Sequence, residues 1–104
     1  MLQKLSQITQ NRLKLADHLQ NLSDTEFDMM HGCMCIAGHA MMLAGGHPDF
    51  TQWEKIRDTA GDWLGLTTSE ANVLFSHYRG KVSSSDAAKV VRHLAATDEI
   101  DWSI

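Results

Sequence analysis

Two histidines and two cysteines lie within nine residues of each other near the middle of the chain. They are His31, Cys33, Cys35 and His39. Imidazole nitrogens and thiolate sulfurs are preferred zinc ligands, so one hypothesis is a zinc site that uses all four side chains. If a helix begins near residue 33, Cys35 and His39 lie one turn apart on the same side of it. His31 and Cys33 would reach that side from the preceding loop.

The same four residues permit two other interpretations. A free cysteine often behaves as a small buried hydrophobe, and a buried histidine can hydrogen-bond within a core. We favour this packing interpretation, because the ligand pairs of known zinc fingers lie farther apart in sequence. Alternatively, the thiolate of Cys33 or Cys35 at a helix N-terminus could act as a nucleophile, with a histidine as its base. The local sequence lacks a third, orienting group, so we predict a protein without enzymatic activity.

Methionines cluster around the same segment. They are Met29, Met30, Met34, Met41 and Met42. Methionine fills irregular gaps in a core and also lines adaptable binding surfaces. Met29 and Met30 fall in a connection between helices, where we expect them to be exposed. Together with His31 they form the predicted contact edge, either for a protein partner or for self-association.

Residues 60 to 74 have the hydrophobic spacing of a helix-turn-helix. Gly61 is the small residue, Gly65 is the turn glycine, and positions 64, 66, 71 and 74 are apolar. A DNA-binding regulator is therefore a further alternative. A recognition helix needs exposed donors for phosphates and bases, and the segment from Ser69 to Tyr78 has no Lys or Arg before Arg79. Nucleic-acid binding is disfavoured for that reason.

Hydrophobic periodicity predicts one all-α domain over residues 1–104, with about five helices and no strands. The first helix spans residues 2–22. Its apolar face consists of Leu2, Leu5, Ile8, Leu15, Leu19 and Leu22. Its solvent side consists of Lys4, Gln7, Asn11, Lys14 and Asp17. A central helix, about residues 33–45, is apolar nearly all round, which predicts that the others pack around it.

Three later segments have the spacing of a capping box. In this motif a Ser or Thr hydroxyl and an acidic side chain three residues later satisfy free amide donors at a helix start. The segments are Thr51 to Glu54, Thr67 to Glu70 and Ser83 to Asp86. We expect each to begin a helix, with glycines at 65 and 80 ending the first two. In the tail, we expect Trp102 to fold back on the core.

Composition is that of a globular protein. Apolar residues make up 43% and charged residues 21%, and the net charge of -4 disfavours nonspecific adhesion to nucleic acid or anionic membrane. The uncharged run of residues 29 to 48 has an apolar part of about 12 residues, against the roughly 20 that a membrane span needs. The chain shows no secretion signal at its start, and its two cysteines suggest free thiols in a reducing compartment. We therefore expect a cytoplasmic protein.

Parts of the sequence resemble a recurrent pattern in small uncharacterised helical proteins of phages and bacteria. The pattern spans about half of the chain: Phe27-Asp28-Met29, Cys35-Ile36-Ala37-Gly38-His39-Ala40, Leu43-Ala44-Gly45, Leu64-Gly65-Leu66-Thr67, Glu70-Ala71 and Leu74-Phe75. The resemblance implies an all-helical fold and a phage or mobile-element context, in a group without an established function. Small phage proteins of this kind often bind and modulate a host protein. We therefore predict a non-enzymatic protein-interaction module, with zinc binding and DNA binding as alternatives.

Overall fold

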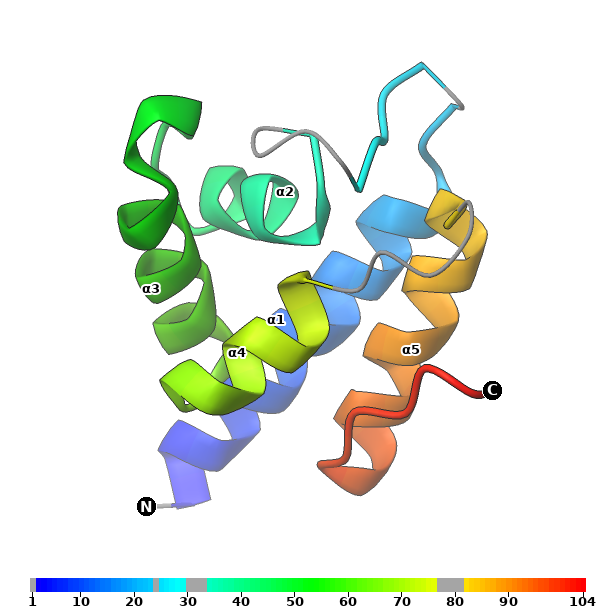
Figure 1. Ribbon diagram of the computed structural model, residues 1–104. Helices are drawn as coiled ribbons and strands as arrows, with labels where there is room; N and C mark the ends of the chain where they lie inside the picture. The colour runs from blue at the N-terminus through cyan, green and yellow to red at the C-terminus, as the bar shows by residue number, and fades with distance from the viewer. Residues whose placement is uncertain (1, 24, 30–33, 77–81) are drawn as a thin grey trace.

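The computed structural model describes residues 2–23, 25–29, 34–76 and 82–104. The elements shown in Figure 1 are α1 (Leu2–Gln20), α2 (Ile36–Leu43), the 3-10 helix η1 (Phe50–Gln52), α3 (Trp53–Leu64), α4 (Thr68–Phe75) and α5 (Ser84–Thr97). The described residues contain no strand, which confirms the all-α prediction. None of the described helices is long and apolar enough to cross a lipid bilayer.

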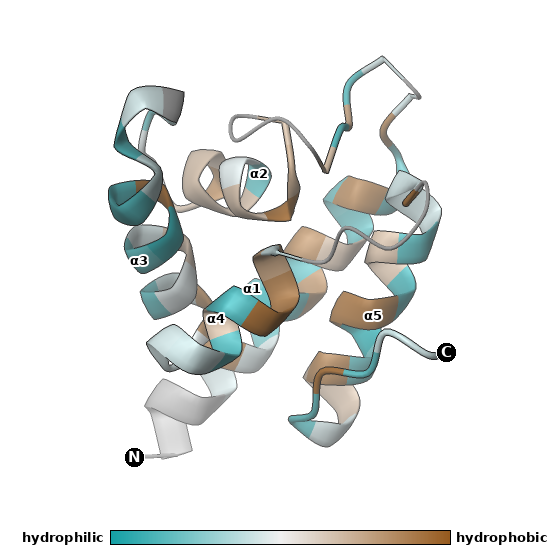
Figure 2. Ribbon diagram, viewed as in Figure 1, coloured by the Kyte–Doolittle hydropathy of each residue, from teal (hydrophilic) through white to brown (hydrophobic). Residues whose placement is uncertain are grey.

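Helix α1 connects the two sides of the fold. Its most extensive contact is with α5, and it also contacts α2 and α3. Helix α3 packs in turn against α2 and α4. Figure 1 shows α5 on one side of α1 and α3 on the other. In Figure 2 the hydrophobic segments of α1 and α5 lie where these helices face each other, whereas much of the outer surface of α3 is hydrophilic.

The contact between α1 and α5 forms one half of the hydrophobic core. Leu15 and Leu19 of α1 are completely buried, as are Val91 and Leu94 of α5. Residues three or four apart lie on one face of a helix, so each pair presents an apolar stripe to the other helix. Burying each of these side chains stabilises the fold by about 1.5–3 kcal/mol.

Helix α2 is buried over most of its length, as its nearly uncharged sequence predicted. Residues 36 to 41 are all buried. The helix is shorter than the predicted range of 33–45, and Ala44 caps its end. Gly45 then turns the chain with a φ of 93°, a left-handed conformation that favours glycine. Met42 is 44% exposed, so one side of α2 reaches the surface.

Two of the three predicted capping boxes are confirmed. The Thr67 hydroxyl accepts from the amide of Glu70, and the Glu70 carboxylate accepts from the amide of Thr67. Ser83 and Asp86 make the same reciprocal pair at the start of α5. Helix α4 ends at Phe75 rather than at position 80, because the next residue leaves the helical region of the backbone.

The capping prediction at Thr51 is wrong. Asp49 caps η1 instead, and its carboxylate accepts from the Thr51 amide at 3.0 Å and from the Thr51 hydroxyl at 2.7 Å. A hydrogen bond to a carboxylate is stronger than one between neutral groups, so the upstream aspartate draws in the hydroxyl. Helix α3 then begins after Gln52, whose side chain makes no capping hydrogen bond.

Two polar side chains of α1 are buried and join other helices to it. Asn11 was predicted on the solvent side, which is wrong: it is 7% exposed and donates to a carbonyl in the last turn of α3. Arg12 is 5% exposed. Its guanidinium donates to the carbonyls of Leu64 at 2.9 Å and Leu94 at 3.3 Å, and to the Asp98 carboxylate at 2.7 Å. These carbonyls lie in the C-terminal turns of α3 and α5, where free acceptors and the helix dipole favour a cation.

Candidate functional site

Three segments meet at the imidazole of His39, which is 5% exposed. Its Nε2 lies 2.8 Å from the backbone carbonyl oxygen of Glu26, in the connection before α2. Its Nδ1 lies 2.9 Å from Nε2 of His18 on α1. The Phe27 ring stacks on the imidazole, with the ring centroids 6.2 Å apart. His39 therefore ties α2 both to α1 and to the connection between them.

These hydrogen bonds determine how His39 is protonated. A carbonyl oxygen can only accept, so Nε2 of His39 carries the hydrogen and donates it to Glu26. In the neutral ring Nδ1 is then the acceptor, and Nε2 of His18 donates to it. Burial lowers the pKa of His39, the Glu26 carbonyl opposes this shift, and the neighbouring His18 adds to it. The net effect favours the neutral ring that the geometry requires.

The predicted zinc ligands are only partly visible in this arrangement. Both ring nitrogens of His39 are committed to hydrogen bonds, and Cys35, directly before α2, is 1% exposed. The described residues contain no group of three or more His, Cys, Asp or Glu placed to hold a metal ion. His31 and Cys33 lie outside the described residues, so the four-ligand zinc site stays a prediction. Packing accounts for the described pair, and the burial of Cys35 keeps its thiol from acting as an exposed nucleophile.

The predicted contact edge is also only partly visible. We expected Met29 to be exposed, and that is wrong: its side chain is 6% exposed and belongs to the hydrophobic core. Met30 and His31 lie outside the described residues. A residue this deeply buried cannot contact a partner without a rearrangement.

Helices α3 and α4 meet in a tight corner, as the spacing of residues 60 to 74 predicted. Gly65 ends α3 with a φ of 71°. The two helices approach closely at Gly61, where an added Cβ would lie 3.3 Å from the Cβ of Ala71. The exposed side chains of α4 carry no positive charge, and Arg79 lies outside the described residues. The described part of this corner therefore offers no cation from α4 to a DNA phosphate.

A groove lies between α4 and the tail that follows α5. Its volume is about 460 Å³, and it is lined by Glu70, Val73, Asp98, Glu99, Ile100 and Asp101. Trp102 holds the tail in place, because its indole N–H donates to the backbone carbonyl of Val73 at 3.0 Å. The prediction that Trp102 folds back on the core is thus confirmed. The groove exists because two segments about 30 residues apart are joined at this point.

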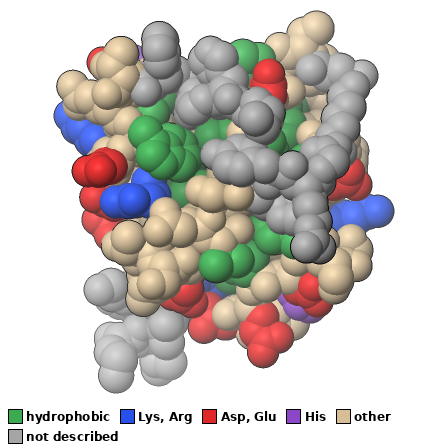
Figure 3. Space-filling view, viewed as in Figure 1, with side chains coloured by type: hydrophobic (Ala, Val, Ile, Leu, Met, Phe, Trp, Pro, Cys, Tyr) green, Lys and Arg blue, Asp and Glu red, His purple; other side chains and the backbone are tan. Residues whose placement is uncertain are grey.

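The centre of the groove is apolar and its surroundings are acidic. Val73 is 55% exposed, and Ile100 is half-buried against the core. Four of the six lining residues are Asp or Glu. Figure 3 shows acidic side chains along the lower edge of the molecule, below a patch of hydrophobic side chains. An exposed apolar patch surrounded by side chains of one charge is typical of a surface that binds a partner of the opposite charge.

Three of the four carboxylates also hold the groove together. Glu70 belongs to the capping box of α4. Asp98 pairs with the buried Arg12 and ends α5 with a left-handed φ of 61°. Asp101 accepts from the hydroxyl and the amide of Ser103, which lowers its pKa and keeps it ionised. These contacts fix the carboxylates in place before any partner arrives, which reduces the entropic cost of binding.

Sequence reasoning missed this groove. The feature of the sequence that could have indicated it is the run of acidic and apolar residues from Asp98 to Trp102, directly after a predicted helix. Only the tertiary contact with Val73 turns that short segment into one wall of a site.

Residues 35–40, one part of the sequence pattern noted above, are the cap residue and the buried start of α2. These residues pack in the core, whereas Glu70, another residue of the pattern, lines the groove. In comparisons with known proteins, no family model, no curated protein and no solved structure matches this chain.

Proposed function

We propose that this protein is a non-enzymatic interaction module that binds a basic, amphipathic segment of a partner protein in the groove between α4 and the tail. The observation that carries the proposal is the exposed Val73, beside Ile100, within a ring of four carboxylates. Apolar side chains of the partner would cover Val73 and Ile100, and its Lys or Arg side chains would meet the carboxylates. The overall charge of -4 would favour the approach of such a partner.

Self-association through this groove is the weaker alternative. A twofold dimer places the same patch of each copy against the other. Here that would bring carboxylates against carboxylates around Val73, which costs free energy. A different protein with a basic segment avoids this cost. If the chain has the phage context that its resemblance implies, that partner would be a host protein.

A model peptide tests the proposal directly. The probe is a fluorescently labelled helical peptide built from repeats of Leu-Lys-Lys-Leu, titrated with the full chain and followed by fluorescence anisotropy. We expect saturable binding that weakens as salt is added, because exposed charge pairs are screened. A second peptide, with Glu in place of every Lys, should not bind.

Two pairs of variants locate the binding surface. Val73→Ser should weaken binding about tenfold, because burying a valine is worth about 1.5–3 kcal/mol and about 1.4 kcal/mol is a factor of ten. Leu13→Ser is its control, since Leu13 is 45% exposed on α1 outside the groove. Glu99→Lys should weaken binding several-fold and reduce its salt dependence. Asp62→Lys makes the same charge change at an exposed position of α3 outside the groove, so it should do neither. Equal effects of each variant and its control would place binding elsewhere and contradict the proposal.

A further inference from the structure

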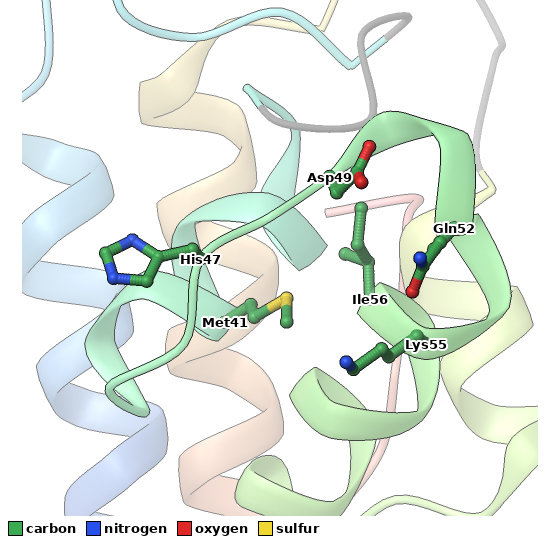
Figure 4. A pocket seen from close by; sticks show the side chains of 6 residues that line it. All are labelled: Met41, His47, Asp49, Gln52, Lys55 and Ile56. Carbon is green, nitrogen blue, oxygen red and sulfur yellow. The ribbon is translucent and has the colours of Figure 1, made fainter.

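A second pocket lies on another side of the fold, between the end of α2 and the start of α3 (Figure 4). Its volume is about 320 Å³, within the range of small-molecule sites. The lining residues are Met41, His47, Asp49, Gln52, Lys55 and Ile56. Met41 and Ile56 are 5% and 1% exposed and form an apolar floor. The other four are exposed, so the pocket combines a buried apolar base with a polar rim.

Opposite charges stand on the rim of this pocket. Asp49 comes from the loop after α2, where the Thr51 hydroxyl and amide, followed by the charge of Lys55, lower the pKa of its carboxyl. It is therefore an anion at neutral pH. Lys55 lies on the first turn of α3, and its side chain is exposed. In Figure 4 the Asp49 carboxylate and the Lys55 ammonium lie on opposite sides of Met41 and Ile56, and the His47 ring points away from them.

We propose that this pocket binds a small zwitterion whose ammonium and carboxylate are separated by a short apolar chain. The ammonium of the ligand would meet Asp49 and its carboxylate would meet Lys55. The apolar chain would lie on the side chains of Met41 and Ile56. A ligand with a single charge can pair with only one of these two groups. The site is separate from the groove at α4, so this inference does not depend on the proposed function.

The floor of the pocket can adjust to the length of the ligand. Met41 has three rotatable side-chain bonds and a polarisable sulfur, which suits a variable apolar contact. Its position depends on Gly46: a Cβ there would lie 3.0 Å from Met41 Cγ and 3.1 Å from Met41 Cε. The variant Gly46→Ala would therefore displace the Met41 side chain and change the floor while leaving Asp49 and Lys55 unaltered.

The test uses a series of ω-amino acids of increasing length: γ-aminobutyrate, δ-aminovalerate and ε-aminocaproate. Caproate and hexylamine are the controls with one charge each. Each compound is titrated to millimolar concentration into the 104-residue chain and followed by two-dimensional amide NMR. We expect at least one ω-amino acid to shift the amides of Met41, Gln52 and Ile56 saturably. It should bind about tenfold more tightly than either control compound.

Variants then assign each end of the ligand. Lys55→Gln should reduce the affinity of the ω-amino acid to that of hexylamine. Asp49→Asn should reduce it to that of caproate, and the fold should persist because Asn also caps helices. Lys89→Gln, at an exposed position of α5 outside the pocket, should change nothing. The proposal is overturned if no ω-amino acid binds at these residues, if a single-charge compound binds as tightly, or if either Lys55→Gln or Asp49→Asn leaves the affinity unchanged.

Discussion

Replacing Arg12 by methionine removes a buried cation while keeping an apolar stem of similar length. The guanidinium donates to the carbonyls of Leu64 and Leu94 and to the Asp98 carboxylate. A hydrogen bond involving a charged group contributes about 1.5–3 kcal/mol to stability. Arg12→Met removes all three of these bonds, but their loss is not equally costly.

The Leu64 carbonyl loses its charged donor. The Leu94 carbonyl keeps another donor, the amide N–H of Asp98 at 2.8 Å. The Asp98 side chain is 80% exposed, so its carboxylate regains water. We therefore expect the free energy of unfolding to fall by roughly 2–4 kcal/mol, chiefly from the buried contacts. The melting temperature of a domain this size falls by about 4–8 °C for each kcal/mol, so the shift is roughly 8–32 °C.

Urea unfolding at neutral pH, followed by far-UV circular dichroism, measures this loss. The urea midpoint should decrease while the dependence of the free energy on urea is unchanged, which separates a stability effect from a change in compactness. Asp98→Asn is the matched control, because Asn tolerates the left-handed backbone and only the exposed ion pair is lost. It should cost less than about 1 kcal/mol. An Arg12→Met variant within about 0.5 kcal/mol of the native chain would contradict the stabilising role of the buried guanidinium, and so would an Asp98→Asn variant that costs as much as Arg12→Met.

Three further predictions concern pH, capping and backbone strain. Burial lowers the pKa of His39 from its ordinary value of 6.5, so below pH 6.5 the unfolded chain binds a proton at this residue more readily than the folded chain does. The free energy of unfolding should therefore decline as the pH falls below 6.5. The urea midpoint of His39→Gln should decline less over the same pH range. Thr67→Ala should cost about 1 kcal/mol in urea unfolding, and Thr51→Ala should cost less because Asp49 still accepts from the backbone there. Gly65→Ala should lower the melting temperature more than Gly45→Ala, because both have positive φ but only the Cβ at position 65 would clash, at 2.6 Å from Ile8 Cδ1. The first prediction would be contradicted if His39→Gln and the native chain lost stability equally with falling pH. The second would be contradicted if Thr67→Ala and Thr51→Ala cost the same free energy of unfolding, and the third if Gly65→Ala and Gly45→Ala lowered the melting temperature equally.

Local patterns in the sequence predicted the helices well. The apolar run around Ile36 gave a buried helix, and the boxes at Thr67 and Ser83 begin helices as expected. In the two capping boxes the deciding interaction joins residues three apart along the chain. The prediction at Thr51 failed because a competing acceptor, Asp49, lies just upstream and binds the hydroxyl. A charged acceptor two residues away was enough to change which residue caps the helix.

Those local patterns could not predict contacts between residues far apart in the sequence. Arg12 and His39 each find their partners on other helices, and His18 lies 21 residues from His39. The groove depends on Trp102 reaching Val73, 29 residues away. Hydrophobic periodicity indicates which face of a helix is apolar. It does not indicate which other segment packs against that face, or whether the face stays exposed. The candidate sites could therefore be assembled only from the fold.

The most direct test of the interaction role is an amide NMR titration of the full chain with the Leu-Lys-Lys-Leu peptide. Binding in the groove should shift the amide signals of residues 70–75 and 98–102 together. The indole N–H signal of Trp102 should show one of the largest shifts, because its hydrogen bond to the Val73 carbonyl joins the two sides of the groove. Val73→Ser should suppress these shifts. Saturable shifts confined to other surfaces, or no shifts at all at peptide concentrations well above that of the protein, would contradict the account.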